Sequence, residues 1–124
     1  AEEVGGGIFI MTYASNSMND FGLYFKGTNI VKACTTNSEE GSGGFLSVQG
    51  EAMNAYSPFH LAVVGLQVSD TSSSAAGGVF SILAGQDCMQ HAHLSITSSV
   101  FDQVGAGGEN GGSGSVMFLN AISE

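Results

Sequence analysis

Short apolar runs bounded by Gly, Ser and Asn follow one another along the whole chain. None of them shows the 3.6-residue spacing of an amphipathic helix, and their length and bordering residues are typical of β-strands. Because the runs are short and evenly distributed, the pattern predicts an all-β protein with little helix. Eight runs are the strand candidates: residues 7–14, 21–26, 29–36, 44–49, 59–69, 78–84, 93–101 and 115–122.

Several runs alternate apolar and polar residues, as residues 45–49 and 94–97 do. Alternation is typical of an antiparallel sheet that has one buried and one solvated face. We therefore expect a single antiparallel β-sandwich or jelly-roll-like domain of about eight short strands. A tight hairpin turn is expected at residues 26–29. The one helix candidate is residues 49–56, which Pro58 would end.

Four strand candidates open in a similar way, with small residues followed by apolar ones. The openings begin at Gly5, Gly43, Gly77 and Gly114, at intervals of 38, 34 and 37 residues. A true repeat should also match between its openings, and these stretches do not match. We therefore interpret the openings as a recurrent way of starting a strand. The chain is then one domain, residues 1–124, with a flexible N-terminus at 1–7 and a Gly-rich loop at 103–115.

The charge balance excludes several classes of partner. The 124 residues include only 2 Lys or Arg against 11 Asp or Glu, for a formal net charge of -9. Nucleic-acid binding needs basic groups to neutralise phosphates, so no nucleic-acid partner is expected. No apolar run approaches the roughly 18 residues needed to cross a bilayer, so no membrane insertion is expected.

The most concentrated reactive side chains are Cys88, His91 and His93. Two His at i and i+2 project from one face of a strand, and thiolate with imidazole would suit zinc or copper. The simpler interpretation is a buried cysteine beside two solvent-facing histidines, and it predicts no bound metal and no cofactor. Cys34 and Cys88 could also form one disulfide, closing a loop of about 50 residues; otherwise they are small buried side chains.

Catalytic equipment is sparse, because the carboxylates are dispersed and no Gly-x-Ser-x-Gly motif occurs. We therefore expect a non-enzymatic structural subunit that assembles with copies of itself, in an extracellular filament, a virion or decoration shell, or a tail-type tube. An extracellular, cell-surface or virion location would fit that role. The predicted assembly surface lies on the most apolar run and comprises Phe59, Leu61, Val63, Val64, Leu66 and Val68.

The alternative function is a carbohydrate- or ligand-binding β-sandwich. Tyr13, Tyr24 or Tyr56 would then stack against sugar rings, although the lack of Trp weakens this hypothesis. A metal-dependent enzyme that uses His91 and His93 is the third hypothesis.

Overall fold

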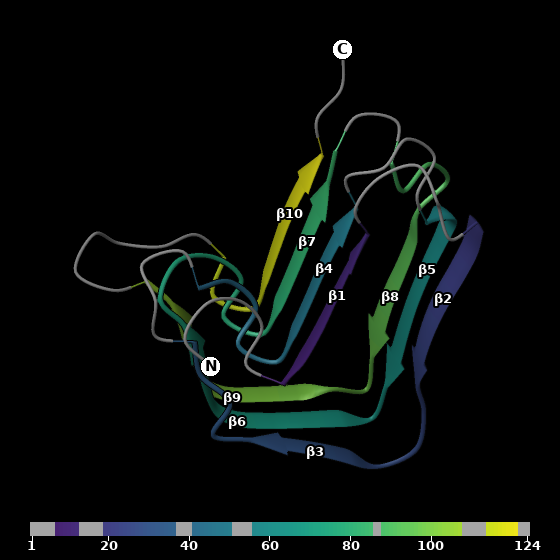
Figure 1. Cartoon of the computed structure of the whole chain (residues 1–124). Helices are drawn as coiled ribbons and strands as arrows, with labels where there is room; N and C mark the ends of the chain where they lie inside the picture. Colours follow the sequence, from purple (N-terminus) through teal and green to yellow (C-terminus); the bar gives the residue numbers. More distant parts are fainter. Residues whose placement is uncertain are drawn as a thin grey trace.

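The computed structural model describes residues 7–12, 19–36, 41–50, 56–85, 88–107 and 114–121. These residues form three sheets of parallel strands (Figure 1). Sheet A contains β1 (Ile8–Thr12), β4 (Leu46–Gly50), β7 (Phe80–Ala84) and β10 (Met117–Ala121), in that order. Sheet B contains β2 (Asn19–Phe25), β5 (Ser57–Val64) and β8 (His93–Thr97). Sheet C contains β3 (Asn29–Lys32), β6 (Leu66–Ser73) and β9 (Val100–Ala106).

Consecutive strands belong to different sheets, so the chain winds as a coil. Each turn of the coil contributes one strand to sheet A, one to sheet B and one to sheet C, and the next turn stacks on it in register. In Figure 1 sheets A and B face one another and sheet C closes one side between them. The result is a β-helix of three coils, with β10 adding a further strand to sheet A.

The predicted antiparallel sandwich is therefore wrong, although the all-β class is confirmed. All seven strand pairings are parallel, and each joins equivalent strands of neighbouring coils. Alternation could not reveal this, because a coil also has an inner and an outer face. Pairing depends on which strand lies beside which, and residue alternation within one strand carries no such information.

Three of the four glycine openings recur at equivalent places of successive coils, which corrects our interpretation that they are not part of a repeat; the first, at Gly5, lies outside the described residues. Gly43, Gly77 and Gly114 have positive φ values of 66°, 64° and 71° and turn the chain into β4, β7 and β10. A Cβ at any of them would collide with a backbone carbonyl three residues ahead, so only glycine fits. The stretches between the openings do not match because a coil requires only inward apolar residues and corners at fixed places.

Two further corners repeat in each coil. Gly27, Gly65 and Ser98 turn the chain from sheet B into sheet C, all with positive φ. Sheet C bends where a second residue of each coil has a positive φ, at 56°, 50° and 50° in the three coils. Each of these residues comes directly after one of three residues that are paired in register. Because none of these residues is glycine, the sequence does not indicate the bend. They are Ala33, Asp70 and Gln103.

The core consists of apolar columns that run from coil to coil. A Cβ at Gly50 would lie 3.2 Å from the Tyr56 ring, so alternate residues of β4 face inward. The column through Val48 and Ile82 shows how burial depends on stacking, because Val48 is 0% exposed and Ile82 is 1% exposed. Leu119 continues this column on β10 and is 54% exposed. An inward position is therefore fully buried only where neighbouring coils lie on both sides.

Several local predictions can now be placed. Residues 26–29 form a corner between two sheets and not a hairpin, because β2 and β3 do not pair. The apolar run 59–69 is divided by Gly65 into β5 and β6. Part of the predicted loop 103–115 is strand, since β9 extends to Ala106. The helix candidate begins in β4, and its residues 51–55 lie outside the described part of the chain, as do residues 1–6 of the predicted flexible N-terminus.

Within the described residues, no helix is long and apolar enough to cross a bilayer.

Candidate functional site on the outer face of sheet C

Sheet C presents a face whose outward side chains form two rows across its three strands. The inward residues Val31 and Val68 are buried in the core, so their neighbours along each strand point away from it. The register places equivalent outward residues side by side on β3, β6 and β9. We call these six residues the sheet C face: Ile30, Gln67 and Val100 in one row, and Lys32, Ser69 and Asp102 in the other.

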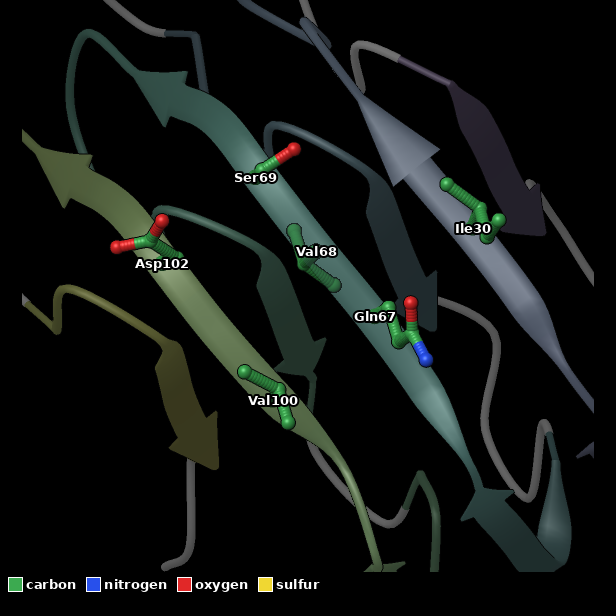
Figure 2. A pocket seen from close by; sticks show the side chains of 6 residues that line it. All are labelled: Ile30, Gln67, Val68, Ser69, Val100 and Asp102. Atoms are coloured by element: carbon green, nitrogen blue, oxygen red, sulfur yellow. The ribbon is translucent and has the colours of Figure 1, made fainter.

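The first row is apolar at both ends. Ile30 is 71% exposed and Val100 is 61% exposed, and Gln67 lies between them. The row therefore exposes two branched apolar side chains, one on each side of the Gln67 amide. Figure 2 shows these side chains standing on three neighbouring strands.

The second row carries opposite charges at its two ends. Lys32 on β3 and Asp102 on β9 are both in register with Ser69 on β6. Their strands are two strand spacings apart, about 9–10 Å between backbones. Both groups are exposed, so solvent screens them in the isolated chain.

A shallow groove of about 350 Å³ crosses this face. It is lined by Ile30, Gln67, Val68, Ser69, Val100 and Asp102 (Figure 2). The groove is open to solvent, and the sheet C face supplies one carboxylate but no thiol or imidazole. The ionisable groups of the sheet C face are the Asp102 carboxylate and the Lys32 ammonium, which lie at opposite ends of one row.

The predicted assembly surface lies mostly in the interior. Phe59, Leu61, Val63 and Leu66 are 0% exposed, and Val68 is 2% exposed. Val64 is the exception at 44%, because it has the opposite parity on β5. The run is apolar on both parities in sequence, but its division at Gly65 turns both halves toward one core. Five of the six residues therefore stabilise the coil and are not available to a partner.

The predicted metal ligands are not brought together. His93 begins β8, whereas His91 lies before the strand with a positive φ of 55°, so the i, i+2 argument does not apply to them. Cys88 is buried and both histidines are exposed. Among the described residues, no three His, Cys, Asp or Glu side chains gather closely enough to hold a metal ion. Cys34 and Cys88 are both present as thiols, so the disulfide is not formed.

The three tyrosines have separate environments. Tyr56 is buried, with its ring centroid 4.7 Å from that of Phe21, so it offers no stacking platform to a sugar. Tyr24 is exposed on the outer face of sheet B, and the Lys26 ammonium lies 5.8 Å from the centre of its ring. Tyr13 lies outside the described residues.

Sequence reasoning missed the sheet C face, because its members come from three separated segments. No common residue pattern marks the three segments, since the middle one carries Gln67 and Ser69 where the outer two carry an apolar residue followed by a charged one. The two rows exist only once the coils are aligned. Comparison of the chain with protein-family models, with curated proteins and with solved structures gives no match.

Proposed function

We propose that this chain is a non-enzymatic structural subunit that pairs with a second copy of itself through the sheet C face. The observation that carries the proposal is the charged row, in which Lys32 and Asp102 stand at opposite ends with Ser69 at the centre. When a second copy of this row faces the first in the reverse order, each positive end lies opposite a negative end.

The pairing follows from a two-fold axis that lies between two such faces and runs parallel to β6. Rotation about this axis exchanges the β3 side with the β9 side. Lys32 then faces Asp102 of the partner subunit, and Asp102 faces Lys32 of the partner subunit. The interface is isologous, so each dimer contains the ion pair twice.

The apolar row obeys the same symmetry. Ile30 faces Val100 of the partner subunit, which covers side chains that are largely exposed in the single chain. Gln67 faces its own copy, and an amide both donates and accepts hydrogen bonds. Apolar burial would supply the association free energy, at about 25 cal/mol per Å², while the two ion pairs would fix the orientation.

The expected affinity is modest. Three strand spacings by about seven residues give a flat area of about 300 Å², well below the roughly 800 Å² per partner of a stable interface. The net charge of -9 also opposes association. We therefore expect a concentration-dependent dimer in the micromolar to millimolar range, which added salt affects in two opposing ways: it screens the net repulsion and weakens the ion pairs.

A charge-reversal cycle tests the proposal by sedimentation velocity. Lys32→Glu and Asp102→Lys should each weaken dimerisation at least about tenfold, because each places like charges opposite one another twice per dimer. The double variant Lys32→Glu with Asp102→Lys should restore dimerisation to near the original level, since the row is reversed but still self-complementary.

Lys26→Glu is the matched control, because it makes the same change of charge at the only other lysine, which lies over Tyr24 on sheet B. It should weaken dimerisation only slightly, through the net charge. The proposal is wrong if the unmodified chain is monomeric at millimolar concentration, if Lys26→Glu has as large an effect as Lys32→Glu, or if the double variant fails to recover.

A further inference from the structure

Two histidines from neighbouring coils lie side by side on the outer face of sheet B. His60 on β5 and His93 on β8 are register partners in a parallel pair. Their ring centroids are 6.2 Å apart, with an angle of 47° between the ring planes. The sequence separates these residues by a whole coil, so spacing alone does not connect them.

The strand alternation explains why both imidazoles point outward. Phe59 and Leu61 flank His60 along β5 and are fully buried, which places His60 on the opposite face. His60 is half-buried and His93 is exposed. The two imidazole rings therefore stand on the outer surface of the sheet and are accessible to solvent.

The third position of this row carries no side chain. Gly22 on β2 is the register partner of His60. The Tyr24 ring lies over Gly22, because a Cβ there would be within 2.5–2.9 Å of the Tyr24 ring atoms and hydroxyl. No carboxylate belongs to the row, so its ligand chemistry is that of nitrogen with a nearby phenol.

We propose that His60 and His93 together bind a late first-row divalent metal ion, for which Zn²⁺ is the probe. Neutral imidazole nitrogen is a good ligand for zinc, copper and nickel, with metal–nitrogen distances of about 2.0–2.1 Å. Reaching a shared ion requires the rings to turn toward one another, and His93 is free to do so because it is exposed. Water completes the coordination, so the ion is exchangeable.

The bound ion would link coil 2 to coil 3. Coils contact only their neighbours, so a bond between two of them stabilises the folded chain directly. A ligand that binds the folded state and not the unfolded chain raises stability as its concentration exceeds its Kd. This site is distinct from the sheet C face and does not depend on dimerisation.

The experiment combines calorimetric titration of the native chain with Zn²⁺ and thermal unfolding with Zn²⁺ or with EDTA. The unmodified protein should bind one ion per chain with micromolar to sub-millimolar affinity, and Zn²⁺ should raise its Tm. His60→Asn and His93→Asn should each weaken binding at least about tenfold and remove the rise in Tm. Both side chains project from the sheet, so both variants should fold, which far-UV circular dichroism without metal checks.

His91→Asn is the matched control, since His91 is also exposed and lies two residues from His93 but is not part of the pair. It should bind Zn²⁺ as the unmodified protein does. The proposal is overturned if no heat of binding is seen at millimolar Zn²⁺, if removal of His91 weakens binding as much as removal of His60, or if His60→Asn leaves binding unchanged.

Discussion

The outward side chains of sheets A and C differ in burial. Ser47 and Ser81, which alternate with inward apolar residues on sheet A, are fully buried, and their hydroxyl groups have no hydrogen-bond partner. Ile30 and Val100 on sheet C are the two most exposed of the large apolar residues described. Polar groups are therefore hidden on one side of the coil, and apolar groups face water on the other.

The difference shows that position around the coil decides burial more than residue type does. The corners that lead into sheet A are crowded, since a Cβ at Gly44 would lie 2.6 Å from the Ser72 carbonyl and one at Gly78 would meet the Gly105 carbonyl. At the corner that leads into sheet C the space depends on the coil, because a Cβ at Gly27 would meet nothing within 4 Å and one at Gly65 would lie 2.6 Å from the Gly27 carbonyl. The outward serines of sheet A are thus buried, whereas the outward apolar residues of sheet C are exposed.

The largest effect should come from a charge placed on each face. Ser81→Asp buries a carboxylate without a partner, and we expect the free energy of unfolding to fall by at least about 3 kcal/mol. Gln67→Asp makes the same change of charge on the exposed sheet C face and should stay within about 0.5 kcal/mol. Urea unfolding at low protein concentration measures both. Equal losses in the two variants would show that the two faces do not differ in enclosure.

A smaller effect is expected from a methyl group at the corners. Gly77→Ala should cost about 3 kcal/mol, because its φ of 64° disfavours a side chain and the new Cβ collides with the Phe80 carbonyl. Gly27→Ala has a similar φ of 80° but open space, and should cost about 1 kcal/mol. The difference in urea midpoint between these variants isolates the crowding. If Gly27→Ala proves the more damaging, the crowding argument is wrong.

The smallest effect should come from removing a buried hydroxyl. Ser81→Ala eliminates a buried polar atom that has no hydrogen-bond partner, so we expect the free energy of unfolding to rise by up to about 1 kcal/mol. Ser69→Ala on sheet C should change it by only a few tenths. Thermal unfolding of both variants, with circular dichroism as the signal, gives the comparison. A marked loss of stability in Ser81→Ala would mean that the hydroxyl makes a contact important to the fold.

The positions of the strands could be predicted from the sequence, and their partners could not. Each of the eight expected runs overlaps at least one strand, because inward residues such as Leu61 and Val48 alternate with other residues within each strand. The parallel pairing depends on stacking between residues about 35 positions apart. The one sequence signal for it was the spacing of Gly43, Gly77 and Gly114, which we had attributed to strand starts alone.

The candidate sites were beyond sequence reasoning for the same reason. His60 and His93 become neighbours only when β5 and β8 are aligned, and Lys32 and Asp102 belong to one row only when three coils are aligned. The buried state of Ser47 was equally hidden, because alternation predicts a solvated position for it. What could not be predicted was in each case a relation between coils and not a property of any one strand.

The stacked corners also say where this chain can change in length during evolution or engineering. The bend of sheet C and the glycine that opens the next coil are joined by segments of different lengths. These segments run from Ala33 to Gly43, from Asp70 to Gly77 and from Gln103 to Gly114. The stretches from Gly65 to Asp70 and from Ser98 to Gln103 are, in contrast, equally long, and the one from Gly27 to Ala33 differs from them by a single residue. Insertions between sheets C and A would therefore lengthen a connection and leave the strands of neighbouring coils paired in the same register. An insertion within the second kind of stretch would shift the inner and outer faces of all residues up to the next corner. The connection between sheets C and A is thus the natural place to graft a new sequence onto this scaffold.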